Sequence, residues 1–523
     1  MSMTFRGRLL AATVCVGALS AATLAAAPAQ AETLADAIAL AYQNNPTLQA
    51  QRATQRALDE SYVQARSGWR PTLGLAGSAR WSENQTPLRG RGQDFDGDGI
   101  PDTPGALVGG ASRSNVGQAA LTFSQPLWTG GRVAAAVNAA NADVLAGRET
   151  LRRVEAQVIV SVIQAYSDTR RDQETLRIRQ ENVSVLTRQL EESQARFDVG
   201  EVTRTDVAQS QARLSQAQAL YQQAVAQLAI TRASYAALVG QNPGDLAPEP
   251  SLAFLLPGDP DEVFQAAEEF NPQLRAQQYT EMASRARLAG ARAERMPQVS
   301  AQLQVGHQGV VDPWDPRETW GRGYSATVNA SVPLFNGGLT TSRVRAAAER
   351  NNADRITIEG VRRNVLQAAT QWWSQLIAAR ANIASSEEQV RAARIAAEGT
   401  RQEQQVGLRT TIDVLNAEQE LRQAELNQVS SRRDEYVAAA NVVATMGRLE
   451  AKHLIPSEPQ YDAAKNFRKL RITWGWVPWE EPIGVIDRLL TPFPSSAPSE
   501  PKDQAPVAPG LQPAPAVAPS APR

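Results

Sequence analysis

Four segments of the chain alternate between apolar and polar residues, which predicts β-strands. The alternation is strictest in residues 298–305 and 324–332, where serine, threonine, asparagine or glutamine separates the apolar residues. Residues 72–81 and 117–124 show the same pattern less regularly. Such strands have one apolar and one wet face, and here the wet face consists of small neutral groups, as in a water-filled lumen. A soluble hairpin packed by its apolar face is the alternative.

Each pair of predicted strands is followed by a long helical pattern. Residues 132–197 contain no proline and one glycine, Gly147, and at about 1.5 Å per residue they would form a helix about 100 Å long. In residues 205–239 large residues recur every seventh position with small residues between them: Val207, Leu214, Tyr221, Leu228 and Tyr235, separated by Ser210, Ala217, Ala224 and Thr231. This seam is typical of a close-packed coiled coil, so we expect a projecting helical hairpin.

The whole arrangement occurs twice. Pro126-Leu-Trp-Thr-Gly-Gly131 returns as Pro333-Leu-Phe-Asn-Gly-Gly338, and upstream of it Asn45-Pro46 returns as Asn271-Pro272. Pro71 likewise matches Pro297, but it lies farther from Pro126 than Pro297 does from Pro333, so the first copy holds extra residues in this interval. A long internal repeat predicts one structural unit built twice.

The repeat and the two ends of the chain set the predicted domain boundaries. Arg6 and Arg8 precede an apolar run that ends at Ala29-Gln30-Ala31, which is typical of a cleaved export signal. The only cysteine, Cys15, lies in this signal, so we expect a mature protein without disulfides, a reactive thiol or a lipid-bearing cysteine. The predicted parts are a signal peptide at 1–31, repeats at 32–240 and 261–450, a linker at 241–260, a C-terminal packing segment at 451–491 and a disordered tail at 492–523.

The last two parts are assigned from their composition. Trp474, Trp476 and Trp479 are expected to pack the C-terminal segment against the helical hairpins. In the tail ten of 32 residues are proline, and such a composition cannot form a core.

Charge and residue content exclude several classes of function. The 53 basic and 54 acidic residues give a net charge of −1 without a basic block, so nucleic acid is not an expected partner. The two histidines, His307 and His453, lie in no nucleophile, zinc or phosphate-loop pattern, so we predict that the protein is not an enzyme. After the signal no run of 18 apolar residues occurs, and no membrane-spanning helix is predicted.

Four strands cannot close a membrane cylinder, because the unpaired amides of a lipid-exposed sheet edge find no water. Since barrels begin at about eight strands, the strands would have to be pooled between two or three chains. The long hairpins would then form a second, helical cylinder that continues the first.

The sequence resembles the TolC family of outer-membrane efflux proteins over about residues 32–455. The resemblance rests on the two strand–Pro-Leu-[Trp/Phe]-x-Gly-Gly–helix junctions and on the turns at 199–207 and 406–414. It implies an α+β membrane protein that forms a homotrimer, with a twelve-stranded β-barrel in the outer membrane and a twelve-helix coiled-coil tunnel across the periplasm. It also implies two partners, a periplasmic adaptor (membrane fusion) protein and an inner-membrane ABC or proton-driven pump.

The resemblance places functional residues at the tips of the hairpins. Four positions match the family's periplasmic gate and its acidic ring: Thr205, Asp206, Arg409 and Asp413. The turns at Val199-Gly200 and Val406-Gly407 match its adaptor-docking sites. Gln404 and Asn416 depart from the pattern, since they replace a gate tyrosine and a second acidic ring.

The gate positions have a functional and a structural interpretation. Three-fold closure would turn each aspartate into a ring that selects cations, and an Arg409–Asp206 link would be charge-assisted, so its loss should bias the entrance open. In the structural alternative, Thr205 or Thr410 with the aspartate that follows it only caps the second helix of its hairpin.

The extra residues of the first copy fall in a loop predicted at 83–115. It contains aspartates at alternate positions before a glycine: Asp94, Asp96 and Asp98, followed by Asp102. Short loops wrap calcium in this way, although Gly105 stands where an EF-hand has glutamate. The spacing resembles the shorter acidic calcium loops of extracellular proteins, and a solvated acidic loop is the alternative.

Together these features predict a passive exit duct of a tripartite export system, located in the outer membrane with its helical part in the periplasm. The missing lipid-anchor cysteine favours type I protein secretion. The alternatives are a multidrug efflux duct of the same architecture and a non-channel periplasmic coiled-coil scaffold.

Overall fold

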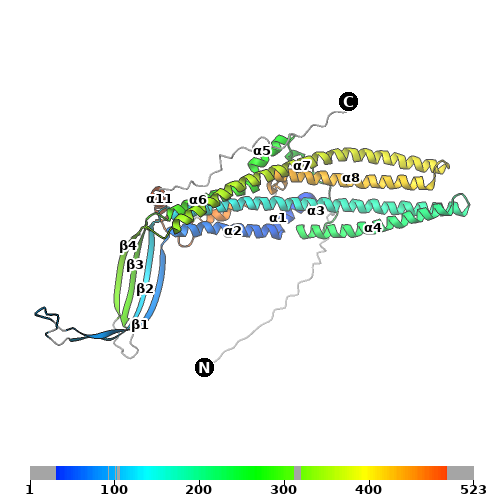
Figure 1. Ribbon diagram of the computed structural model, residues 1–523. Helices are drawn as coiled ribbons and strands as arrows, with labels where there is room; N and C mark the ends of the chain where they lie inside the picture. Colours follow the sequence, from blue (N-terminus) through cyan, green and yellow to red (C-terminus); the bar gives the residue numbers. More distant parts are fainter. Residues whose placement is uncertain are drawn as a thin grey trace, which may run out of the picture.

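The computed structural model describes residues 31–91, 94–100, 102, 106–310, 320–456, 458–470 and 472–491. The predicted tail and all but the last residue of the predicted signal peptide lie outside the described residues. Two long helical hairpins run side by side away from a four-stranded sheet (Figure 1). Each helical hairpin follows one pair of strands along the chain, which confirms the predicted order of strands and long helices.

The first repeat leads through two helices and a β-hairpin into a helical hairpin. Its elements are α1 (Leu34–Asn44), α2 (Pro46–Arg66), the short helix η1 (Ser67–Trp69), β1 (Thr72–Arg91), β2 (Ala106–Trp128), α3 (Arg132–Asp198) and α4 (Arg204–Val239). The second repeat follows the same order after the short helix η2 (Ala253–Leu255): α5 (Pro260–Phe270), α6 (Pro272–Ala293), β3 (Gln298–Val310), β4 (Gly321–Ser331), α7 (Leu339–Gln405) and α8 (Thr411–Thr445). The chain continues through α9 (Ala451–Leu454), α10 (Ala463–Lys469) and α11 (Glu480–Leu489).

The repeated Asn-Pro pair starts a helix in each copy. The Asn45 side chain accepts hydrogen bonds from the backbone N–H groups of Thr47 (3.0 Å) and Leu48 (3.3 Å), and Pro46 takes the first helical position, where its missing N–H has no intrahelical partner. Asn271 and Pro272 do the same for α6. The Asn45-Pro46 pair is therefore the boundary between α1 and α2.

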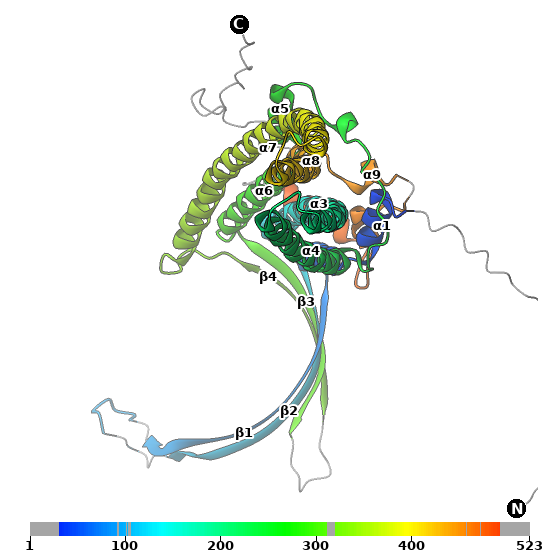
Figure 2. The same cartoon turned by 90° about the vertical axis from the view of Figure 1, so that its right-hand side faces the viewer.

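The sheet has the order β1-β2-β3-β4, and every neighbouring pair is antiparallel. Thr72 lies opposite Ser124 in the first hairpin, and Gln298 lies opposite Ser331 in the second. The alignment of the two sequence copies matches Thr72 with Gln298 and Ser124 with Ser331, so both hairpins have the same register. The sheet curves strongly, and β1 and β4 form its free edges (Figure 2).

The predicted alternation produces one apolar face that crosses the sheet. One row across the four strands consists of Leu73, Phe123, Leu303 and Ala326, and the next of Leu75, Leu121, Val305 and Tyr324. Most of these side chains are exposed in the single chain, including Leu75, Leu303 and Tyr324. In the described part of the chain, therefore, these two rows of the apolar face do not pack on a core, unlike those of a soluble hairpin.

The bounds predicted for the loop at 83–115 are wrong. β1 continues to Arg91 and β2 begins at Ala106, so most of the extra residues lengthen the strands of the first hairpin. Polar residues occupy both faces here, as in the neighbouring pairs Ser82–Ser114 and Glu83–Arg113. No alternation of apolar and polar residues therefore marked the extension, and it is defined by backbone pairing alone. In Figure 1 this hairpin projects well beyond β3 and β4.

The helical hairpins pack through the predicted heptad positions and share one hydrophobic core. Leu214, Leu228 and Tyr235 of α4 are buried, as are the small residues between them, which confirms the heptad pattern. The main hydrophobic core contains buried residues from helices of both repeats, among them Ile163 of α3 and Val443 of α8. Beside it, the Tyr166 hydroxyl donates to the carbonyl groups of Glu32 (2.9 Å) and Ala247 (2.7 Å). The inter-repeat linker is thus fastened to α3. Among the described residues, no helix combines the length and the apolarity needed to cross a membrane.

The C-terminal segment is fixed by buried acids rather than by its tryptophans. Trp474 is fully exposed (100%), so its predicted packing against the hairpins is wrong. Glu480 is completely buried instead and accepts from the guanidinium Nε of Arg66 (2.7 Å) and of Arg70 (2.9 Å). The apolar contribution of α11 comes from Ile483.

Asp487 of α11 caps the long helix α3 across the fold. The N-terminal residue before α3, Gly131, has a positive φ of 85° and no side chain to offer. The buried Asp487 carboxylate accepts from the backbone N–H groups of Thr129 (2.9 Å), Gly131 (3.1 Å) and Ala134 (3.3 Å) and from the indole N–H of Trp69 (3.1 Å). An anion at a helix N-terminus satisfies otherwise unpaired donors and the helix dipole. The point where the strand becomes a rod is therefore rigidly held.

Candidate functional site at the tips of the helical hairpins

The first tip connects α3 to α4 through a glycine turn and a capping box. Gly200 has a φ of +83°, which a residue with a side chain adopts only with strain. Thr203 is the N-cap of α4: its hydroxyl accepts from the Asp206 N–H (3.3 Å), and the Asp206 carboxylate accepts from the Thr203 N–H (2.9 Å). The hydrogen bonds from Thr203 lower the pKa of Asp206 below its ordinary value.

The second tip repeats this geometry between α7 and α8. Gly407 has a φ of +79°. The Asp413 carboxylate accepts from the hydroxyl (2.7 Å) and the backbone N–H (3.1 Å) of Thr410, and these bonds lower the pKa of Asp413. The cap predicted at Thr410 is confirmed.

The cap predicted at Thr205 is wrong. Helix α4 begins at Arg204, so Thr205 already lies inside its first turn and Thr203 is the capping residue. The sequence contained the signal, because the alignment of the two copies matches Thr203 with Thr410. A capping threonine also stands three residues before its acidic partner, and Thr205 is only one residue before Asp206.

The structure gives Arg409 a partner other than Asp206. Its guanidinium Nε donates to Glu403 (2.8 Å) in the same tip, and Glu403, followed by Asp413, raises the pKa of Arg409. Asp206 belongs to the other hairpin and is engaged with Thr203. Among the described residues of one chain these two gate positions form no ion pair, so a link between them would have to join two chains.

Gln404 and Asn416, the two residues that depart from the family pattern, both form hydrogen bonds within their own chain. Gln404 is buried, and its amide lies 3.5 Å from the Thr411 hydroxyl. Asn416 accepts a hydrogen bond from Arg213 of α4 (3.0 Å), which also donates to Gln419 (2.5 Å). Arg213 therefore bridges the two hairpins near their tips, and no sequence motif had marked it.

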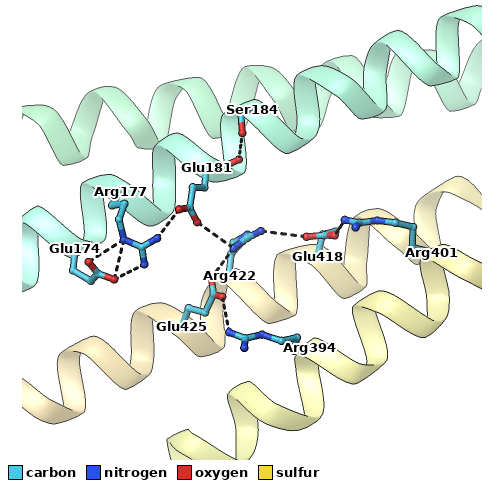
Figure 3. A network of polar contacts seen from close by, with 9 residues as sticks. All are labelled: Glu174, Arg177, Glu181, Ser184, Arg394, Arg401, Glu418, Arg422 and Glu425. Atoms are coloured by element: carbon cyan, nitrogen blue, oxygen red, sulfur yellow. Dashed lines mark hydrogen bonds and ion pairs between the residues drawn. The ribbon is translucent and has the colours of Figure 1, made fainter.

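A charged network joins the hairpins farther from the tips (Figure 3). The Arg422 guanidinium of α8 lies 3.9 Å from Glu181 of α3, 2.7 Å from Glu425 and 3.7 Å from the buried Glu418. Arg401 of α7 also contacts Glu418. Isolated surface ion pairs stabilise proteins little, but a network around a buried carboxylate restricts how its helices can shift. The tips are thus connected by polar contacts that sliding of one hairpin past the other would break.

The turns predicted to dock an adaptor form the outer ends of both rods. Val199 and Val406 are exposed beside their turn glycines, Gly200 and Gly407. Each tip therefore presents an aliphatic side chain next to a sharply bent backbone, and the predicted role stays a prediction.

The acidic loop of the first hairpin brings three of its four aspartates together. Carboxylate oxygens of Asp94, Asp96 and Asp102 lie within 4.8 Å of one another. Asp98 turns away and accepts from the Ile100 N–H (2.8 Å). The N–H groups of Gly99 and Gly97 bind Asp94 and lower the pKa of its carboxylate. The side chains fit a hard cation that prefers oxygen ligands, and the calcium site stays a prediction.

Comparison with known proteins identifies the family. The family model described as outer membrane efflux protein matches residues 37–241 and 263–448, which covers both repeats. The chain belongs to this family.

Individual relatives agree with the family and with the fold. The outer membrane efflux protein BepC of Brucella suis is 30% identical over 438 residues, spanning 84% of this chain and 90% of BepC. The alkaline protease secretion protein AprF of Pseudomonas aeruginosa is 26% identical over 306 residues, spanning 57% of this chain and 63% of AprF. The solved outer membrane protein VceC of Vibrio cholerae superposes with a TM-score of 0.64 at 20% identity, covering 79% of this chain and 96% of VceC.

Membership of this family confirms several predictions. The protein is an outer-membrane efflux channel with the two-repeat, mostly helical fold of TolC-like channel-tunnels. Its helical part lies in the periplasm, and the protein is not an enzyme.

Thr203 and Thr205 form a matched pair for testing the cap. Thr203→Val removes the hydroxyl that caps α4 and should cost about 1 kcal/mol of local stability, whereas Thr205→Val should have little effect. Hydrogen exchange of the amides at 206 and 207 measures the difference, with faster exchange expected only in Thr203→Val. Equal exchange in the two variants would contradict the assignment.

Calcium titration calorimetry of the purified protein tests the acidic loop. Since extracellular calcium modules bind with dissociation constants of about 0.1–1 mM, binding in this range is expected for the wild type and not for Asp94→Asn. Asp261→Asn, at an exposed aspartate of α5, is the control. Absence of binding by the wild type, or unchanged binding by Asp94→Asn, would refute the calcium site.

Proposed function

We propose that three copies of the chain form a passive exit duct for type I protein secretion. A twelve-stranded β-barrel in the outer membrane would continue into a twelve-helix tunnel in the periplasm. The observation that carries this proposal is the open sheet: β1 and β4 have unpaired edges, and a sheet with an apolar face cannot present such edges to lipid. Pairing between chains removes both edges at once.

The contact between repeats inside one chain supports this assembly. β2 pairs with β3, and α3 packs against α6, so the first repeat already binds the second through strands and helices. A ring would repeat that contact between chains, with β4 of one chain against β1 of the next and α7 against α2. The number three comes from the resemblance to the TolC family.

The tips would form the periplasmic entrance. Val199-Gly200 and Val406-Gly407 would dock a periplasmic adaptor protein, which connects the duct to an inner-membrane ABC or proton-driven pump. Thr205, Asp206, Arg409 and Asp413 would line or link the gate between neighbouring chains. Gln404 and Asn416 make contacts within their own chain, so the resting entrance would depend on the Arg213 bridge as well.

The cargo has two candidate classes. AprF is named for secretion of alkaline protease, which supports protein export, and BepC is named as an efflux protein, which supports the alternative of a multidrug or small-molecule efflux duct. Deletion of the gene separates them: loss of a protein from the culture medium is expected for type I secretion, whereas drug sensitivity with an unchanged set of secreted proteins would favour efflux.

Single-channel conductance in planar bilayers tests the duct and its gate. The detergent-purified wild type should show small discrete openings, and Arg409→Ser should enlarge them because the cation at the entrance is lost. Arg391→Ser removes an exposed cation that pairs with Glu388 on the same helix, α7, and this change should leave the conductance unchanged.

Two results would contradict the proposal. A protein that stays soluble without detergent and conducts no ions would be a scaffold rather than a channel. Equal enlargement in Arg409→Ser and Arg391→Ser would show that Arg409 has no special role at the entrance.

A further inference from the structure

The C-terminal segment at residues 472–490 has one face fixed to the protein and one apolar face without a partner in the described part of the chain. Glu480, Ile483 and Asp487 lie on the buried face of α11. The outer face carries large apolar residues that are exposed: Trp474, Trp476, Trp479, Ile486, Leu489 and Leu490. Since the buried acids hold α11 in one orientation, Ile486 and Leu489 of this helix are kept pointing outward.

The segment lies on the apolar face of the sheet, at the end where the strands meet the rods. The indole N–H of Trp479 donates to the Gln125 side chain (3.0 Å). Gln125 follows Leu121 and Phe123 at intervals of two residues along β2 and pairs with Ala301 of β3, so it belongs to the apolar face. Figure 1 shows α11 at this junction of sheet and helices.

We propose that residues 472–490 are an interfacial membrane anchor that lies in the headgroup layer of the periplasmic leaflet of the outer membrane. The inference rests on the proposed barrel, in which the apolar face contacts lipid. A segment at the rod end of that face then lies at the membrane surface, outside the barrel. The partner is a phospholipid surface.

The residue types of the segment fit this partner. Tryptophan is enriched at membrane–water interfaces because its ring is apolar and its N–H is polar, and membrane β-barrels have aromatic girdles at both interfaces. Leu489 and Leu490 can enter the acyl boundary in the manner of an interfacial helix. Two exposed cations, Lys469 just before the segment and Arg488 near its end, can meet lipid phosphates.

The second repeat presents apolar residues at the same level without any helix over them in the described part of the chain. Leu334 and Phe335 are the counterparts of Leu127 and Trp128 in the repeated Pro-Leu-[Trp/Phe] junction, and they are 93% and 89% exposed. A ring of six repeats would therefore carry an apolar belt at the height of the barrel–tunnel junction. Because α11 is clamped to both α2 and α3, contact of this belt with lipid would fix the height of that junction in the membrane.

Depth-dependent fluorescence quenching tests the proposal on the full-length protein. Leu489→Cys, made in a Cys15→Ala background so that its thiol is unique, is labelled with a polarity-sensitive dye and reconstituted into phospholipid nanodiscs. Lipids with a spin label near the headgroup or deep in the acyl chain serve as quenchers. Leu303→Cys, on the apolar face of the sheet, and Ile395→Cys, exposed on α7, are the matched controls.

The label at 489 should emit at shorter wavelength than the label at 395 and should be quenched mainly by the shallow spin label. A label at 489 that behaves like the label at 395 would overturn the anchor. So would a blue-shifted label that no lipid quenches, because a neighbouring subunit or another protein would then cover α11. Failure of the deep spin label to quench position 303 would instead refute the proposed barrel, and the anchor with it.

Leu490→Cys provides a second site if Leu489→Cys does not assemble. The expected results are the same, because both residues are exposed at the end of α11. Lipid quenching at neither site in assembled protein overturns the proposal.

Discussion

The structure depends on one constraint, which is that a backbone amide in lipid must be hydrogen-bonded to another backbone group. Each unpaired group costs several kcal/mol in a medium without water. One chain pairs residues 116–124 of β2 and most of β3 on both sides, and it leaves an edge on β1 and on β4. If the apolar face that crosses all four strands contacts lipid, the unpaired amides of the two edges oppose a single-chain sheet in the membrane. In the proposed duct, pairing between chains would remove both edges, and the same step would bring the two helical hairpins of each chain into a common tunnel.

The second constraint acts where the strands of the sheet join the long helices. A strand that turns into a helix of 67 residues must end its pairing and start the helix within a short stretch of chain, and Gly131 leaves the helix N-terminus without a cap of its own. Asp487 supplies the missing acceptor, and Glu480 forms ion pairs with both Arg66 and Arg70. The C-terminal segment therefore helps to hold the sheet and the helical hairpins in their relative orientation.

Much of the architecture could be predicted because the spacing of apolar residues specifies each element locally and because the same pattern occurs twice in the chain. The heptad spacing of Leu214 and Leu228 and the alternation around Leu303 each fix an element and its buried or apolar face. Repetition should also have identified Thr203 as the cap, since it aligns with Thr410. The position of α11 could not be predicted, because Asp487 acts on Gly131 across most of the chain and no short motif encodes that contact. The tryptophans of this segment were misplaced because apolar residues were expected to pack against their own chain.

The internal repeat specifies how two chains should meet. Leu121 of β2 lies opposite Val305 of β3, and the repeat places Val328 of β4 where β2 has Leu121 and Ala79 of β1 where β3 has Val305. Val328 of one chain should therefore lie opposite Ala79 of the next.

Oxidative crosslinking of Val328→Cys with Ala79→Cys tests this register, with Val328→Cys and Gly77→Cys as the control pair out of step. The account predicts efficient intersubunit disulfides for the first pair, because directly opposite residues have Cβ atoms about 4.5–5.5 Å apart, and few for the second. Folded protein that forms no intersubunit disulfide in either pair would contradict closure of the sheet between chains.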